Sequence, residues 1–128
     1  MKQRFFKCSH CGNIIAMVED KGVPVMCCGE KMQEIIPNST DGARETHIPS
    51  VAQDGNLVIV NVGLDEHPMS VEHSIQWISI ETEEGNQRKT LAPGRAAWAE
   101  FSLVEDDELI AVYAYCNRHG LWKKEIKK

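Results

Sequence analysis

Apolar and polar residues alternate along most of the chain after residue 56, and such alternation is typical of half-buried β-strands. Six segments carry the pattern, most of them bounded by Gly, Pro, Asp or Asn: 57–62, 73–81, 88–92, 98–103, 108–115 and 121–126. In the first of them, Val58, Val60 and Val62 share one face. Several segments follow one another at a spacing of about 10 residues, which predicts an immunoglobulin-like antiparallel β-sandwich. No helix of normal length is predicted.

Residues 1–37 have a different pattern and predict a separate, smaller unit. Short apolar segments flank a turn at residues 8–12, and a second turn precedes the segment VMCCGEKM. This stretch has too little apolar mass for a core of its own, so a metal would have to supply folding free energy. Residues 37–42 (PNSTDG) are polar and turn-rich and read as a linker. We therefore expect a metal domain at residues 1–37 and the sandwich at residues 38–128.

The candidate metal ligands of the small unit are cysteines. Four of the five cysteines, Cys8, Cys11, Cys27 and Cys28, fall within the first 28 residues. Their odd total and their clustering favour metal binding over a disulfide framework. A C-x-x-C turn brings two thiolates together, whereas side chains of adjacent cysteines tend to diverge, so we expect a distorted tetrahedron. Four thiolates suit zinc or iron, and their spacing alone does not choose between the two metals.

Composition and charge narrow the class of protein further. The 128 residues are 42% apolar and 26% charged, as in soluble globular proteins. A net charge of −5 and a pI near 5.5 disfavour a general nucleic-acid binder. No apolar run approaches the roughly 18 residues of a membrane span, and the first residues lack the apolar core of a secretory signal. We expect a cytoplasmic protein without a membrane or nucleic-acid partner.

A second set of candidate metal ligands is spread over the predicted sandwich. His67 precedes the second predicted strand and His73 opens it, whereas Cys116 and His119 flank a turn after the fifth strand. His47 comes earlier in the chain, in the segment ETHIP. Each histidine alone is a weak signal. Strand ends meet at the edges of a sandwich, however, and a cysteine and a histidine three residues apart can share one metal. The sequence therefore predicts a second metal site.

These motifs resemble those of a known family. The four-cysteine pattern resembles the desulforedoxin domain, in which C-x-x-C and C-C bind a single iron. HPM at 67–69, EHSIQWI at 72–78 and CNRHG at 116–120 are similar to the neelaredoxin or superoxide reductase domain. The tandem arrangement resembles desulfoferrodoxin, the two-iron form, and the match spans essentially the whole chain.

The resemblance implies a function and a ligand set. It implies two iron ions per chain, the first held by the four clustered cysteines. The second would be held by His47, His67, His73 and His119 as equatorial ligands and by Cys116 as the axial thiolate. The implied activity is superoxide reductase, the one-electron reduction of superoxide to hydrogen peroxide in defence against oxidative stress. A rubredoxin-like electron donor and a homodimer are also implied.

Two residues next to His47 complete the implied active site. Glu45 matches the family glutamate that can occupy the sixth iron position after oxidation. Thr46 stands where the family usually has a lysine beside the open position. That lysine is thought to help attract superoxide, so its absence bears on the electrostatics of the site and leaves the metal ligands untouched. Arg44 is the nearest cation in sequence.

Two other classes of protein share part of this pattern. A rubredoxin-like electron carrier would explain the four cysteines, but a carrier does not need an open coordination position. A zinc-stapled interaction module with an immunoglobulin-like sandwich would leave the second ligand set as coincidence. Metal analysis of protein purified without added zinc separates these classes.

Overall fold

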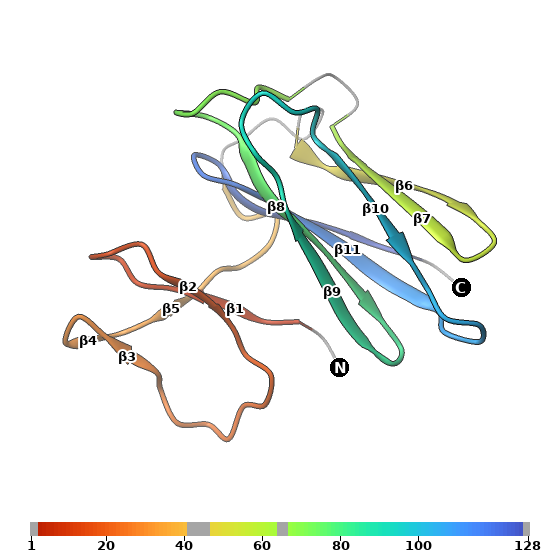
Figure 1. Cartoon of the computed structure of the whole chain (residues 1–128). Coiled ribbons are helices and arrows are strands. Elements are labelled where there is room, and N and C mark those ends of the chain that lie inside the picture. Colours follow the sequence, from red (N-terminus) through yellow and green to blue (C-terminus); the bar gives the residue numbers. More distant parts are fainter. Residues whose placement is uncertain (1–2, 41–46, 64–66, 127–128) are drawn as a thin grey trace. The chain divides into compact units, whose positions relative to one another are not determined.

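The computed structural model describes residues 3–40, 47–63 and 67–126, and these form an all-β protein built from antiparallel sheets (Figure 1). The predicted fold class is therefore confirmed. The chain divides into two compact units, Met1–Ile36 and Pro37–Lys128. Nowhere in the described ranges is there a helix long and apolar enough to cross a bilayer.

The N-terminal unit contains a three-stranded sheet and a small hairpin. The sheet has the order β2-β1-β5, and the hairpin pairs β3 with β4. Their bounds are β1 (Phe5–Lys7), β2 (Ile14–Ala16), β3 (Met26–Cys27), β4 (Glu30–Lys31) and β5 (Gln33–Glu34). The buried apolar residues of this unit are few, and they include Phe5, Cys8 and Met32. So small a core agrees with the expectation that metal binding supplies part of the folding free energy.

The second unit is a sandwich of a three-stranded and a four-stranded sheet. The strand orders are β10-β7-β6 and β12-β11-β8-β9, with all pairs antiparallel. The bounds are β6 (Pro49–Asp54), β7 (Leu57–Val62), β8 (Ile75–Thr82), β9 (Gly85–Thr90), β10 (Trp98–Ser102), β11 (Leu109–Cys116) and β12 (Gly120–Glu125). All six predicted strands are present. Strand β6 was not predicted, because only its first residue is buried and the remainder reads as a polar loop.

The core lies between the two sheets of this unit. Val58, Val60 and Val62 of β7 are buried there, as the alternation predicted, and they belong to one cluster with Ile78 of β8 and Val112 of β11. Strands β8 and β11 are also buried on their other face, since every residue of β11 but one is buried. Burial on both faces explains why the sequence ELIAVYAY is almost continuously apolar.

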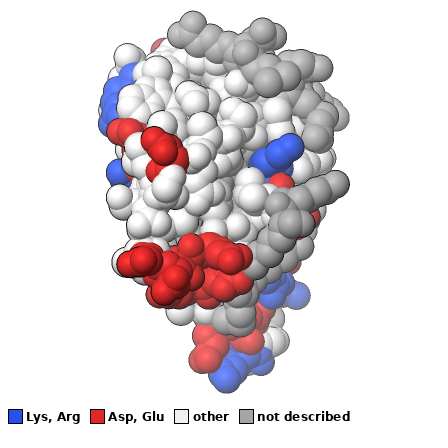
Figure 2. Space-filling model, turned by 90° about the vertical axis from the view of Figure 1, so that its right-hand side faces the viewer, with Lys and Arg blue, Asp and Glu red and all other residues white. Residues whose placement is uncertain are grey.

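The two ends of the sandwich differ in charge. The turn between β8 and β9 and the turn between β10 and β11 hydrogen-bond to each other, for example from the Glu84 amide to the Asp107 carboxylate (3.2 Å). Together these turns carry six acidic residues: Glu83, Glu84, Glu105, Asp106, Asp107 and Glu108. Figure 2 shows acidic side chains gathered on one part of the surface. The opposite end of β8 and β11 holds the second predicted metal site, and the eight-residue strands place it roughly 25 Å away.

Candidate metal centres

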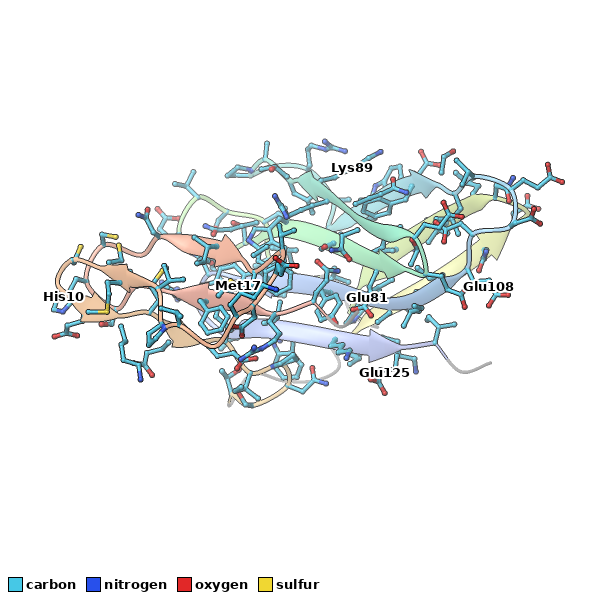
Figure 3. The ribbon with its side chains drawn as sticks, turned by 90° about the horizontal axis from the view of Figure 1, so that it is seen from below. His10, Met17, Glu81, Lys89, Glu108 and Glu125 are labelled. Atoms are coloured by element: carbon cyan, nitrogen blue, oxygen red, sulfur yellow. The ribbon has the colours of Figure 1, made fainter. Side chains whose placement is uncertain are left out.

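The four cysteines of the N-terminal unit converge as predicted. Their sulfur atoms all lie within 4.8 Å of one another. A tight turn closes the first pair, with the Gly12 amide donating to the Cys8 carbonyl at 3.0 Å and Gly12 at φ +82°. In Figure 3, sulfur atoms gather at the end of the unit that carries the labelled His10.

Adjacent cysteines reach one centre through an unusual backbone conformation. Cys27 ends β3, and Cys28 has φ 53°, in the left-handed region that residues other than glycine rarely adopt. This turn of the backbone redirects the second side chain, so the divergence expected of neighbouring cysteines does not occur. The conformation costs on the order of 1 kcal/mol or more, which the unit must offset elsewhere.

Hydrogen bonds to the sulfur atoms shift the pKa values of cysteines in this centre. The Cys11 amide donates to the Cys8 sulfur at 3.5 Å, and this backbone hydrogen bond lowers the pKa of Cys8 to about 6. The pKa of Cys28 is raised to about 12, first because of its hydrogen bonds with the sulfurs of Cys8 and Cys11. Four thiolates this close cannot all ionise without a compensating positive charge, so the group fits a thiolate-bound metal ion.

The second group lies at one end of the sandwich. One ligand atom each from His47, His67, His73 and Cys116 lies within 4.8 Å of all the others. His119 is next to them, with its Nδ1 atom 3.0 Å from His47 Nε2 and 3.8 Å from Cys116 Sγ. The structure thus brings together the four histidines and the cysteine that the sequence singled out.

Cys116 is aimed into this group by an irregularity of β11. It is fully buried at the last position of the strand, and the register between β11 and β8 shifts between Tyr115 and Cys116. Such a bulge locally changes the direction of side chains, and bulges are common beside functional sites. The turn that follows returns the chain to β12 and carries His119.

Two buried imidazole nitrogens have no hydrogen-bond partner among the described residues. They are Nε2 of His67 and Nε2 of His73. His67 Nδ1 lies 2.6 Å from the carbonyl of Pro68, which fixes the proton on Nδ1 and leaves Nε2 as a bare lone pair. A buried bare nitrogen is costly unless something binds it. Both bare nitrogens indicate that a metal ion binds at this position. The hydrogen bond from His67 Nδ1 to the Pro68 carbonyl is the second-sphere contact typical of ligating histidines.

Burial keeps these histidines neutral. Desolvation lowers the pKa of His67 to about 4, and the hydrogen bond to Pro68 opposes that shift only in part. The pKa of His73 is also lowered, first by burial and then by the charges of His119 and Arg118. Neutral imidazoles are the form that binds metals, so the group is ready to ligate at neutral pH.

Trp122 contacts two of the histidines and holds them in position. It is almost fully buried and stacks on the His47 ring, with centroids 5.2 Å apart and planes at 25°. Its indole Nε1 donates to the carbonyl of His119 at 3.1 Å. The rings of His67 and His119 each meet the His47 ring edge-on, with centroids 4.6 Å away.

Asn117 joins the two segments that carry His73 and Cys116. Its side-chain oxygen accepts from the Ser74 amide at 3.0 Å, and its side-chain nitrogen donates to the Glu72 carbonyl at 2.9 Å. These contacts hold the backbone on both sides of His73. Sequence reasoning did not assign this role to Asn117 or a role to Trp122, although Asn117 lies inside the CNRHG motif.

Glu45 and Thr46, like Arg44 beside them, lie outside the described residues.

Four converging thiols in one unit, and four imidazoles with a buried thiol in an antiparallel sandwich, define a metalloprotein with two metal sites. Comparison with known proteins narrows the class, because the sequence profile described as Desulfoferrodoxin matches residues 39–125. The chain belongs to the desulfoferrodoxin family, and the two groups are the two iron sites of that family.

Two relatives match this chain over nearly its full length. The chain is 39% identical over 120 residues to the desulfoferrodoxin of Nitratidesulfovibrio vulgaris, with 94% of each chain covered. It is also 39% identical to a desulfoferrodoxin homologue of Archaeoglobus fulgidus, covering 92% of this chain and 93% of the relative.

Two solved structures match this chain over different lengths. The superoxide reductase from Treponema pallidum has a TM-score of 0.83 and 34% identity, and the match covers 98% of this chain and all of that one. The one-iron superoxide reductase from Giardia intestinalis has a TM-score of 0.56 and 28% identity. It matches over 66% of this chain and 99% of its own.

Proposed function

We propose that this chain is a superoxide reductase, which reduces superoxide by one electron to hydrogen peroxide. The observation that carries the proposal is the group of buried imidazole nitrogens and one buried thiol that converge on a single point. Relatives and solved structures bearing the name superoxide reductase support the same activity.

The ligands of the reactive iron follow from that group. We propose that His47, His67, His73 and His119 supply four nitrogens and Cys116 the thiolate, with Glu45 as a sixth ligand after oxidation. When bound, iron at this centre supplies the electron and an open coordination position. Four neutral imidazoles and one thiolate leave a ferrous ion with a net charge of about +1, which favours an anionic substrate.

The protein's own residues hold this arrangement in place. The Pro68 carbonyl fixes the tautomer of His67, Trp122 fixes the ring of His47, and Asn117 fixes the backbone beside His73. These contacts keep the histidine nitrogens and the cysteine sulfur converged on one point. Rigid positioning of this kind is what second-sphere contacts contribute to metal sites.

A division of labour between the units is part of the proposal. Residues 1–37 hold the first iron through Cys8, Cys11, Cys27 and Cys28, and residues 38–128 hold the reactive one. A rubredoxin-like protein is the proposed electron donor. The free thiols of the described cysteines fit a reducing compartment, and we propose the cytoplasm.

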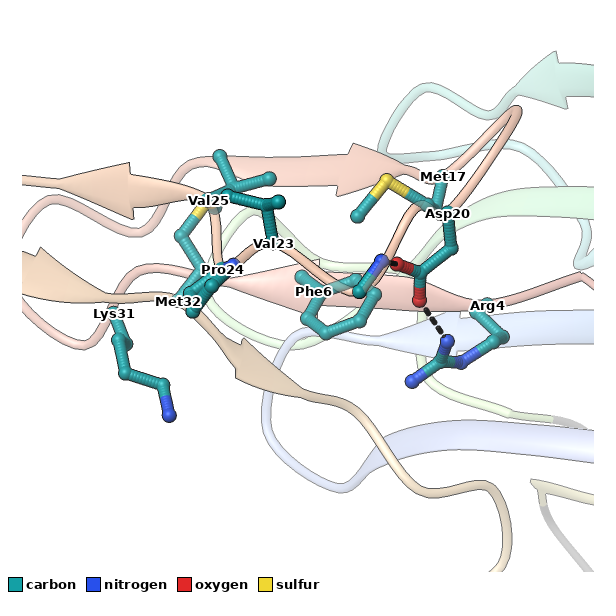
Figure 4. Close-up of a pocket in the computed structure, with 10 residues that line it drawn as sticks. Arg4, Phe6, Met17, Asp20, Val23, Pro24, Val25, Lys31 and Met32 are labelled. Atoms are coloured by element: carbon teal, nitrogen blue, oxygen red, sulfur yellow. Dashed lines mark hydrogen bonds and ion pairs between the residues drawn. The ribbon is translucent and has the colours of Figure 1, made fainter.

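We also propose that the protein is a homodimer joined through the N-terminal unit. That unit exposes several large apolar side chains, including Val18 (88% exposed), Val23 (72%) and Met26 (59%). It also has a groove of about 250 Å³, lined in part by Phe6 and Val23, with an Arg4–Asp20 ion pair at its edge (Figure 4). Exposed apolar surface of this kind commonly marks a protein interface.

Replacing the axial thiolate tests the proposed activity. Cys116→Ser should remove the thiolate-to-iron absorption band and nearly all superoxide reduction. The spectrum of the first iron should persist and serves as the internal control. A Cys116→Ser protein with unchanged turnover would rule out this active site.

A rubredoxin-like electron carrier is the second candidate function, and the four-cysteine group favours it. A carrier would exchange electrons with a partner without consuming superoxide. Iron-loaded protein that is readily reduced and reoxidised but inert toward superoxide would support the carrier.

A further inference from the structure

This inference rests on the proposed function and concerns how an acidic protein attracts an anionic substrate. The net charge of −5 opposes the approach of superoxide at long range. Six acidic residues, however, lie on the turns at the far end of β8 and β11 from the histidines. Charge close to the histidines therefore has more influence on the final approach, because salt screens interactions beyond about 10 Å.

Two arginines lie near the site, and one of them is Arg118. It lies in the turn between Cys116 and His119, and it is exposed. It directly precedes His119 in this turn and follows Cys116 by two residues, so the turn that carries two of the proposed ligands also carries its charge. The backbone of this turn is held in place, because the Asn117 amide donates to the Ser74 carbonyl at 3.2 Å.

The second cation, Arg95, lines a cavity of about 330 Å³ that borders His67. His67, Pro68 and Met69 form one side of the cavity, and residues 94–96 form the other. The Gly94 amide donates to the Met69 carbonyl at 2.7 Å, which ties the two sides together. Among the described residues that line the cavity, Arg95 is the only charged one.

These two arginines are available to an incoming anion. No carboxylate in the described ranges forms an ion pair with either of them. Arg95 shares the cavity with His67, and Arg118 directly precedes His119; both of these rings lie beside the His73 ring, with centroids 4.9 and 5.0 Å from it. An anion drawn by either guanidinium therefore approaches the same group of ligands.

We propose that Arg95 and Arg118 form an anion-attracting surface that draws superoxide, and small monovalent anions in general, to the cavity beside His67. The arginines act on the approach of the substrate and not on the electron transfer. Their effect should therefore appear in the second-order rate constant and disappear as salt screens it.

Pulse radiolysis of the full-length, iron-loaded protein tests the kinetic side. Arg95→Gln and Arg118→Gln should each lower the rate constant for superoxide on the order of two- to fivefold at low ionic strength. The difference should vanish at high salt. Arg88→Gln is the matched control, because Arg88 is exposed on β9 opposite Ser79, away from the histidines, and its loss should have little effect. Equal rates for Arg95→Gln, Arg118→Gln and Arg88→Gln would overturn the proposal.

Binding of nitrate gives a readout that does not depend on activity. Nitrate titrated into the full-length protein loaded with diamagnetic zinc should shift the amide resonances of Gly94, Arg95 and Ala96 in a saturable way. Arg95→Gln should weaken that binding several-fold. Absent shifts, or equal affinity in the variant, would contradict the inference. Wild-type protein that binds nitrate but does not consume superoxide would instead refute the proposed function alone.

Discussion

Asn117 binds no metal in the proposed site, yet its side chain connects the turn that carries Cys116 to the backbone on both sides of His73. Trp122 likewise joins two ligand positions, because it stacks on the His47 ring and donates a hydrogen bond to the carbonyl of His119. Single residues of this kind decide how precisely five ligands from distant parts of the chain meet. Their removal should loosen the metal site more than it destabilises the fold.

Asn117→Ala should lower the affinity of the second site for iron roughly 10- to 100-fold, because both side-chain hydrogen bonds are lost. Asn117→Asp keeps the acceptor for the Ser74 amide and should fall between alanine and wild type. Competition with a chelator measures the affinity. Asn86→Ala, on exposed β9, is the control. Wild-type affinity in Asn117→Ala would show that the backbone alone positions His73.

Thr46 gives a second prediction at this scale. A lysine ammonium about 6 Å from the substrate would add roughly 0.7 kcal/mol of attraction at a dielectric constant of 80, and nearly 3 kcal/mol at 20. Even the lower value corresponds to about a threefold change in rate, so Thr46→Lys should react with superoxide several-fold faster. Its rate should also fall more steeply with added salt. Pulse radiolysis compares the two proteins, and identical rates and salt slopes would mean that other cations already supply the attraction.

At the scale of strands and turns, much of the fold follows from the hydrophobic pattern. Strands β7 and β11 were predicted almost to their ends, because valines or long apolar runs leave little alternative. Strand β6 was missed because an edge strand with one buried residue carries no period-2 signal. The convergence of His47 with His119 could be expected only in outline, since it depends on which strand ends meet. Asn117 and Trp122 act through contacts that no local pattern encodes.

The turn between β11 and β12 provides a prediction about an element. Gly120 has φ +82°, and a Cβ atom there would lie 3.0 Å from Thr40 Cγ2. The Thr40 hydroxyl also donates to the carbonyl of His119. Gly120→Ala should therefore destabilise the fold by about 1–2 kcal/mol for the backbone, with a further cost for displacing Thr40.

Gly55→Ala separates these two costs. Gly55 also has a positive φ, +60°, but a Cβ atom there would contact nothing within 4 Å. Denaturant unfolding of both variants measures the difference in the free energy of unfolding. Equal losses of stability would mean that the contact with Thr40 does not hold the turn.

At the scale of the whole molecule, the two metal sites lie in separate compact units. The match to a one-iron superoxide reductase covers 66% of this chain, so a protein with that name can do without the remainder. The first site should accordingly be dispensable for the chemistry. Cys11→Ser should lose the first iron but retain most of its superoxide reductase activity with an artificial donor. Complete loss of activity would contradict the proposed division of labour.

The stoichiometry of the products tests the central claim most directly. Superoxide is supplied to the iron-loaded protein with excess reductant, and hydrogen peroxide and dioxygen are both measured. A reductase should form one hydrogen peroxide for each superoxide consumed, use one electron from the reductant, and release no dioxygen. Release of dioxygen, with one hydrogen peroxide for every two superoxide molecules, would instead identify a dismutase and contradict the account.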